Sequence, residues 1–145
     1  MSKINKRQIV EAGDTSGWAI DANAHTYSTT QTLLTVTMTS APPGDYAIDA
    51  GCAITPSGSG NCSISPTMSG STGTFTTDIM GCHASDADFS VTKFLHRHSS
   101  NRLSGHPGGT FTITLVFSPE SAVNFVFGNA ADARWASYLR VTKVG

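Results

Sequence analysis

Two histidines separated by a single residue, His96 and His98, are the candidates for metal chemistry in this sequence. On a β-strand the side chains of residues i and i+2 project from the same face, so both imidazoles would point the same way. Around a three-fold axis, such a pair from each subunit would offer an octahedral set of nitrogens to iron, nickel or zinc. His83 and His106 could lie nearby. The alternative is a solvated strand end, because a loop is expected from Ser99 onwards.

Carboxylates offer little support for catalysis or for a calcium site. The two glutamates, Glu11 and Glu120, fall in a terminal segment and in a turn, and no spacing singles out a pair among the aspartates. Asp86 and Asp88 could bind Ca²⁺, but the glycine and distal glutamate of a dedicated calcium loop are missing, which favours a solvated acidic turn. Nucleophile-elbow, zinc-protease, Cys-x-x-Cys and phosphate-loop motifs are also absent from the sequence. We therefore expect a protein that is not an enzyme and requires no cofactor.

The three cysteines are too few for a disulfide framework. A hairpin turning at Ser57–Gly58 would bring Cys52 and Cys62 opposite each other, where a disulfide is geometrically possible. The simpler interpretation is two reduced thiols that pack as small hydrophobic residues. Cys82 has no evident mate, and the sequence leaves the redox state of the first two open.

Aromatic residues outside the expected core could bind a sugar or pack at a subunit interface. Trp18, Trp135 and Tyr138 are the candidates, and Tyr27 also lies outside the core pattern. Rings of this type combine a large apolar face with a polar group and are frequent anchors of protein interfaces. Packing at the rim of the protein's own core is the alternative for each of them.

Residues 1–14 have the character of an arm that precedes a single domain of residues 15–145. The arm carries three of the nine basic residues: Lys3, Lys6 and Arg7. These charges could anchor the protein on an acidic surface such as that of a capsid, whereas a terminus with so few charges is often disordered. A helix from Ile4 to Val10 would be too short to be stable alone.

The elements that must position these residues show a period of two. In Leu34–Thr39 apolar residues alternate strictly with threonine, which predicts a half-buried strand. Ser57–Gly73 is rich in serine, glycine and threonine and is expected to be a loop, and Asn129–Ala136 could hold one helical turn. Short strands separated by Gly, Pro and Ser turns predict an all-β fold, an antiparallel β-sandwich of jelly-roll type. Further strands are expected at residues 46–50, 73–78, 89–98, 111–117, 123–127 and 138–144.

Composition narrows the classes of function. Charged residues make up 13% of the 145 residues, whereas serine and threonine together number 37. A net charge of −1 excludes a strongly basic nucleic-acid binder, and the lack of a long apolar run argues against membrane insertion. Without the apolar stretch of a signal peptide, we expect synthesis in a cytoplasm. Sheets faced with threonine and little charge lack the usual barrier to association, which favours assembly.

Gly109–Gly145 resembles the final hairpin of trimeric complement/tumour-necrosis-factor-like jelly-roll knobs. It contains Gly-Gly-Thr-Phe-Thr-Ile-Thr-Leu, a short turn, a second aromatic strand and a connection through Arg134-Trp135 into Tyr138–Val144. Leu33–Ala50, with an aliphatic strand, Pro-Gly-Asp and Tyr-x-Ile, resembles the early part of the same group. Such knobs occur on phage fibres, receptor-binding proteins and capsid decorations. The resemblance implies a homotrimer whose terminal strand runs along the three-fold axis.

These observations and the resemblance predict a non-enzymatic structural protein of a bacteriophage virion. We expect either a capsid decoration (cement) protein or the knob of a head or tail fibre. It would be made in the host cytoplasm, reside in the virion and contact other capsid or tail proteins. The alternative is a fibre tip that attaches to the host by binding a receptor or surface carbohydrate. Nucleic acid and membrane are not expected partners.

Overall fold

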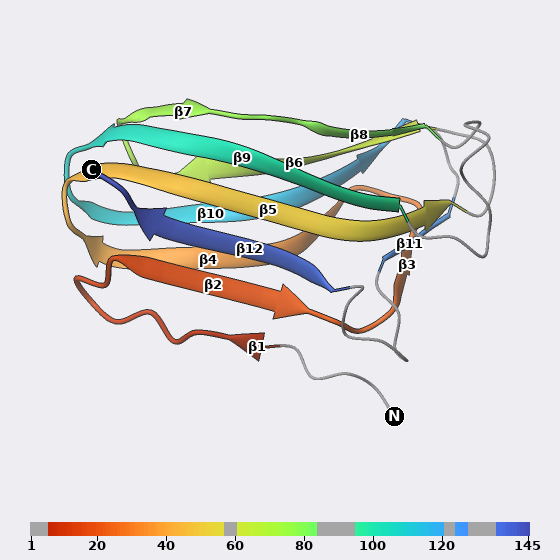
Figure 1. The fold of residues 1–145 in the computed structure, drawn as a ribbon, viewed down its shortest axis with the longest axis horizontal. Coiled ribbons are helices and arrows are strands. Elements are labelled where there is room, and N and C mark those ends of the chain that lie inside the picture. The colour runs from red at the N-terminus through yellow and green to blue at the C-terminus, as the bar shows by residue number, and fades with distance from the viewer. Residues whose placement is uncertain (1–5, 57–60, 84–94, 121–123, 128–135) are drawn as a thin grey trace.

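The computed structural model describes residues 6–56, 61–83, 95–120, 124–127 and 136–145, and these ranges contain β-strands and no helix (Figure 1). All strand pairs among them are antiparallel. The described residues accordingly include no helix of the length and apolarity needed to cross a membrane. The predicted all-β, antiparallel fold class is confirmed.

Sheet A has eight strands, and β5 is its centre. On one side β5 pairs with β12 over residues 46–51 and with β11 over residues 54–56, and β11 pairs in turn with β3. On the other side β5 pairs with β9. The strands are β1 (Lys6–Arg7), β2 (Ser16–Asp21), β12 (Ser137–Lys143), β5 (Gly44–Pro56), β9 (Leu95–His106), β7 (Thr74–Thr76), β11 (Phe125–Phe127) and β3 (His25–Tyr27).

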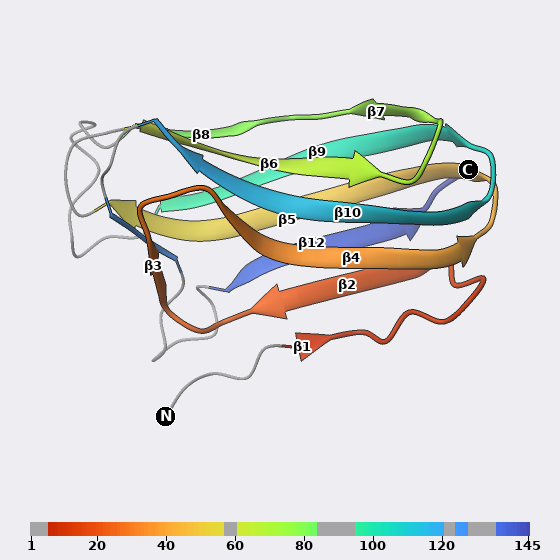
Figure 2. The same ribbon diagram turned by 180° about the vertical axis from the view of Figure 1, so that it is seen from behind.

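Sheet B has four strands and packs against sheet A (Figure 2). Its order is β4 (Gln31–Ala41), β10 (Gly109–Pro119), β6 (Asn61–Ser69) and β8 (Met80–His83). The chain changes sheet at each step from β4 through β5 to β6, and again from β8 through β9 and β10 to β11. Four strands in the order β2-β12-β5-β9 therefore face four in the order β4-β10-β6-β8, which is the connectivity of a jelly roll.

The alternation of apolar and polar residues explains which side chains form the core. In β10, Phe111, Ile113, Leu115 and Phe117 are at most 1% exposed, because they point at the opposite sheet. Burial of each such side chain stabilises the fold by roughly 1.5–3 kcal/mol. The threonines between them point outward and pair with threonines and serines of β4 and β6. The threonine-bearing face expected from the sequence is thus the outer face of sheet B, which points away from the core.

Two segments expected to be loops are strands. The serine-rich Ser57–Gly73 contains β6, in which Cys62, Ile64 and Pro66 point inward and the hydroxyl residues between them point outward. The loop expected from Ser99 is the middle of β9. Its buried polar side chains are satisfied, because Asn101 Nδ2 donates to Ser99 Oγ (3.0 Å) and to the Ile48 carbonyl (3.1 Å). Hydrogen bonding permits polar residues inside the sandwich, which composition alone does not reveal.

Residues 6–13, which we call the strap, connect the edges of both sheets. Residues 6 and 7 pair with β2, Gln8 N donates to the Trp18 carbonyl (3.1 Å), and Gly13 N donates to the Thr39 carbonyl of β4 (3.0 Å). Val10 between them packs against the core. The described part of Ile4–Val10 is therefore extended and not helical, since pairing with an edge strand satisfies its backbone.

A second short segment, residues 74–83, has the same role on the opposite side. Its first half, β7, pairs with β9 of sheet A, and its second half, β8, pairs with β6 of sheet B. The expected strand within residues 73–78 is confirmed in β7. Residues 89–94, and all of Asn129–Ala136 except Ala136, lie outside the described residues.

Candidate functional site: the outer face of sheet A

The strands of sheet A present one set of side chains to the core and the other to the outside. The residues of β2 and β12 that point inward are Gly17, Ala19, Leu139 and Val141. A Cβ added at Gly17 would contact Met38 and Val36 of β4 in the core. The alternate residues of the same strands therefore point outward. We call the following set the A face: Trp18 and Ile20 of β2, Tyr138 and Arg140 of β12, Asp49 of β5, and His96, His98 and Ser100 of β9.

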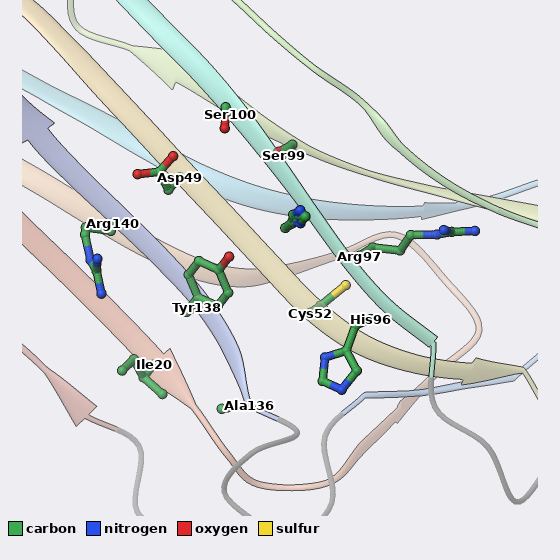
Figure 3. Close-up of a pocket in the computed structure, with 11 residues that line it drawn as sticks. Ile20, Asp49, Cys52, His96, Arg97, Ser99, Ser100, Ala136, Tyr138 and Arg140 are labelled. Atoms are coloured by element: carbon green, nitrogen blue, oxygen red, sulfur yellow. The ribbon is translucent and has the colours of Figure 1, made fainter.

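An open groove of about 630 Å³ runs across the A face (Figure 3). All members of the A face except Trp18 line it. Trp18 lines a smaller adjoining hollow of about 140 Å³ together with Ile20, Tyr138 and Arg140. The fold therefore brings residues from four strands, far apart in the sequence, to one surface.

The register of the strands arranges these residues in two rows. Tyr138 lies between Ile20 and Gly51, and Gly51 is opposite His98. In the next row, Arg140 lies between Trp18 and Asp49, and Asp49 is opposite Ser100. The second row thus places a guanidinium and a carboxylate on neighbouring strands next to an indole ring.

Tyr138 occupies the space above a glycine. A Cβ at Gly51 would lie 2.3 Å from Tyr138 Cε1 and 2.8 Å from its hydroxyl oxygen, so the ring fills the space that a side chain of residue 51 would need. Burial raises the pKa of the Tyr138 hydroxyl, and the nearby charge of Asp49 raises it further. The phenol therefore stays neutral and can both donate and accept a hydrogen bond.

The structure confirms that His96 and His98 share a face, since both are exposed and both line the groove. His106, expected to lie nearby, does not join them. It is 2% exposed and packs against Tyr46 and Phe111, with its ring nitrogens hydrogen-bonded to Ser71 Oγ (2.7 Å) and to the Gly109 carbonyl (3.0 Å). In an unbroken strand His106 would share the outward face of His96 and His98, but a register shift in β9 between Leu103 and His106 reverses the alternation and turns His106 into the core.

Within the described residues, no group of three or more His, Cys, Asp or Glu side chains is close enough to hold a metal ion. One chain supplies the two imidazoles and no third protein ligand from that part of the chain. Asp86 and Asp88, the weaker calcium candidates, lie outside the described residues.

The other predicted site residues fall into two groups. Trp18 and Tyr138 belong to the same surface, as described above, and Lys6 and Arg7 are exposed on β1 beside it. Trp135 and Lys3 lie outside the described residues.

The hairpin expected between Cys52 and Cys62 is wrong. Both residues are buried, but Cys52 belongs to β5 of sheet A and Cys62 to β6 of sheet B, because the chain crosses between sheets at this point. The residue opposite Cys62 in the strand register is Cys82 of β8.

Four residues of the A face escaped sequence reasoning, namely Ile20, Asp49, Ser100 and Arg140. A signal for Asp49 was available, because Tyr46, Ile48 and Ala50 share one face of the strand expected at residues 46–50 and are apolar, so Asp49 between them must point outward. A separate cluster was also missed. His25 Nε2 lies 2.6 Å from Asp21 Oδ2, and the His25 ring stacks on Tyr27 with centroids 5.7 Å apart.

Comparisons with known proteins concern the fold alone. No family model and no curated protein matches the sequence. Among solved structures, murine APRIL at pH 5.0 is similar over 71% of this chain and 68% of its own, with 10% identity and a TM-score of 0.41. TmCBM61 in complex with β-1,4-galactotriose is similar over 97% and 69%, with 11% identity and a TM-score of 0.39. The Cry4Aa toxin of Bacillus thuringiensis is similar over 89% of this chain and 19% of its own, with 11% identity and a TM-score of 0.37. The jelly-roll assignment follows from this chain's own strand order.

Proposed function

We propose that this protein is a non-enzymatic structural subunit that assembles into a homotrimer through the A face. The observation that carries the proposal is the composition of that face. It combines the large, partly exposed side chains of Trp18, Ile20 and Tyr138 with Arg140 and Asp49 in adjacent rows. Tryptophan, tyrosine and arginine are the residues most often found as energetic anchors of protein interfaces.

The outer face of sheet B supports this choice by contrast. Its residues on β4, β10 and β6 are mainly threonine and serine, as in the row Thr35–Thr114–Thr67. Short hydroxyl side chains provide neither an aromatic anchor nor a charge pair, and Thr and Ser are under-represented among hot spots. Of the two outer faces, the A face is therefore the better suited to self-association.

We further propose that the assembly is part of a bacteriophage virion, as a capsid decoration protein or a head or tail fibre knob. This step rests on the resemblance of Gly109–Gly145 to trimeric knobs. In such a particle, β12 would lie along the three-fold axis, and Tyr138 and Arg140 would point toward it. The exposed Lys6 and Arg7 of β1 would remain available to contact an acidic surface of the capsid or tail.

The test is the molar mass in solution, measured by multi-angle light scattering. We expect the wild-type chain to have three times the mass of a monomer. Arg140→Glu places a second carboxylate beside Asp49 and should shift the mass toward that of the monomer. Thr67→Arg, an equally exposed substitution on the outer face of sheet B, is the matched control and should leave the trimer intact. A wild-type monomer, or a trimer disrupted only by Thr67→Arg, would contradict the proposal.

A second candidate function is binding of a carbohydrate, as at a host-attaching fibre tip. It is favoured by one observation, the position of the Tyr138 ring over Gly51 in an open groove whose rim carries Asp49, His98 and Arg140. An aromatic ring bordered by polar groups suits a sugar, which has an apolar face and equatorial hydroxyls. Glycan-array binding that is lost in Tyr138→Ala and retained in Thr67→Arg would support this candidate. A trimer whose interface covers the groove would exclude it.

A further inference from the structure

We propose that Cys62 of β6 and Cys82 of β8 are a redox pair, which forms a disulfide bond when the protein is oxidised and locks the segment of residues 74–83 to sheet B. The two cysteines become neighbours because β8 joins sheet B beside β6. The bond forms within one chain, so it requires neither the trimer nor the A face.

The strand register places the two residues directly opposite each other. Cys62 is paired with Cys82, and two residues further along Ile64 is paired with Met80. Cys62, Ile64 and Met80 are at most 4% exposed and belong to the core. Because residues i and i+2 of a strand share a face, Cys82 falls on the same face of β8 as Met80, which is the face that meets Cys62.

The backbone around Cys62 shows which kind of cross-strand pair this is. The Asn61 carbonyl accepts a hydrogen bond from the Glu120 amide, so the peptide groups of Asn61 point toward the β10 side. Those of Cys62 point the other way, toward β8, and its opposite residue on β10 is Pro119, which has no amide hydrogen to donate. Cys62 and Cys82 are therefore a hydrogen-bonded pair, whose Cα atoms are typically about 5.5 Å apart. Disulfides most often have Cα separations of about 5.5–6 Å, so this spacing suits the bond.

The position of β8 explains how an oxidant would reach buried thiols. This strand is four residues long and is the last strand of sheet B (Figure 2). Residues 76–79, which precede it, are exposed, and Ile79 is 62% exposed. A short edge strand with few buried contacts opens at a low free-energy cost. Local opening would expose the thiols, and release them from the contacts of the closed state, without unfolding the sandwich.

The oxidant would be a low-molecular-weight disulfide such as oxidised glutathione. The thiolate of one cysteine attacks a sulfur of that disulfide, forms a mixed disulfide and expels one glutathione thiolate. The second cysteine attacks the protein sulfur of the mixed disulfide and expels the other glutathione. Two protein thiols are thereby oxidised, and one glutathione disulfide is reduced to two thiols, which take up the two protons. In a reducing cytoplasm the pair would remain as thiols, and an oxidising medium would close the bond.

The bond would strengthen the link between the two sheets on this flank. Residues 74–76 of the same segment pair with β9 of sheet A. The Asp78 amide donates a hydrogen bond to Asn101 Oδ1 of β9 (2.6 Å), which attaches the segment to sheet A a second time. A covalent bond between residues 62 and 82 would add a permanent attachment to sheet B.

The experiment uses the full chain, reduced with dithiothreitol, freed of reductant and equilibrated with oxidised glutathione without denaturant. Thiols are then counted in urea with a chromogenic thiol reagent. We expect the count to fall from the three cysteines of the sequence to one, with an intact mass lower by two hydrogens and a proteolytic fragment that links residues 62 and 82. Closing this loop should raise Tm by about 5–10 °C at fixed protein concentration, and dithiothreitol should reverse the rise.

Cys52→Ala is the matched control, because Cys52 is also a buried cysteine but belongs to β5 of sheet A. It should still form the bond and show the rise in Tm, whereas Cys82→Ala should show neither. The thiol count and the linked fragment are read from the wild-type chain, so they test the proposal even if a variant does not fold. Three thiols that persist, a bond to Cys52, or glutathione adducts without an internal bond would each overturn it. A bond that forms only in urea, or one that leaves Tm unchanged, would do the same.

Discussion

Replacing Gly51 by alanine tests whether Tyr138 is held in place by the lack of a side chain beneath it. The new methyl group would lie 2.3 Å from Tyr138 Cε1, whereas ordinary van der Waals contact begins near 3.4 Å. The ring must therefore move by more than an ångström and leave the groove. Such overpacking costs about 1–3 kcal/mol, and the higher strand propensity of alanine returns about 0.5–1 kcal/mol.

The expected net effect is a loss of about 1 kcal/mol in the free energy of unfolding, or about 2–4 °C in Tm for a domain of this size. Urea denaturation at one fixed protein concentration measures it, because an assembling protein gains stability with concentration. The decisive comparison is a double-mutant cycle with Tyr138→Ala. Without the ring, Gly51→Ala should be neutral or stabilising. If Gly51→Ala has the same effect in both backgrounds, the contact does not hold Tyr138, and the reasoning is refuted.

Three further substitutions probe the fold. The hydrogen bonds from Arg102 and from the Gly105 amide lower the pKa of Asp45 below its ordinary value of 3.8. The folded state is therefore stabilised by ionised Asp45 above that value, and this contribution is lost as the pH falls through the lower pKa of the folded state. Asp45→Asn should flatten the acid limb of a stability–pH curve, and an unchanged limb would show that Asp45 does not contribute. Phe117→Ala removes a fully buried ring packed edge-on against two phenylalanines of β11 and should cost about 3–5 kcal/mol in urea denaturation; a cost below 1 kcal/mol would contradict the packing described. His106→Phe removes the hydrogen bonds of the ring to the half-buried Ser71 hydroxyl and to the Gly109 carbonyl, and should destabilise by about 1–3 kcal/mol. A gain in Tm would show that the hydrogen bonds of His106 are dispensable.

Most of the strands follow from the sequence because their residues obey a period of two. Leu34–Thr39 and Phe111–Phe117 could be oriented correctly, since one face is apolar and the other carries threonine. The same rule failed in β6, where Cys62, Ile64 and Pro66 are a weak apolar face among serines. It also failed at Ser99 and Asn101, whose burial is compensated by a hydrogen bond between their side chains and by one from Asn101 to the Ile48 carbonyl of the neighbouring β5.

The candidate site was predicted in part. His96 and His98 could be placed on one face from their spacing, and Tyr138 was identified as an aromatic outside the core. The grouping of these residues with Trp18, Asp49 and Arg140 could not be predicted, because it depends on which strands are neighbours in sheet A. The change of sheet between β5 and β6 is equally non-local, and for this reason the hairpin joining Cys52 and Cys62 was wrong.

The strap and the segment of residues 74–83 have a consequence for how the molecule can grow. Each is a single short stretch of chain that borders both sheets, one along β2 and β4 and the other along β9 and β6. Parts of both flanks of the sandwich are thereby covered by strands of only two to four residues, although the 11-residue β4 still ends sheet B. Short edges are poor templates for adding another chain by backbone pairing, the route that leads to open-ended fibrils. Along these covered stretches, an added strand finds little backbone to pair with.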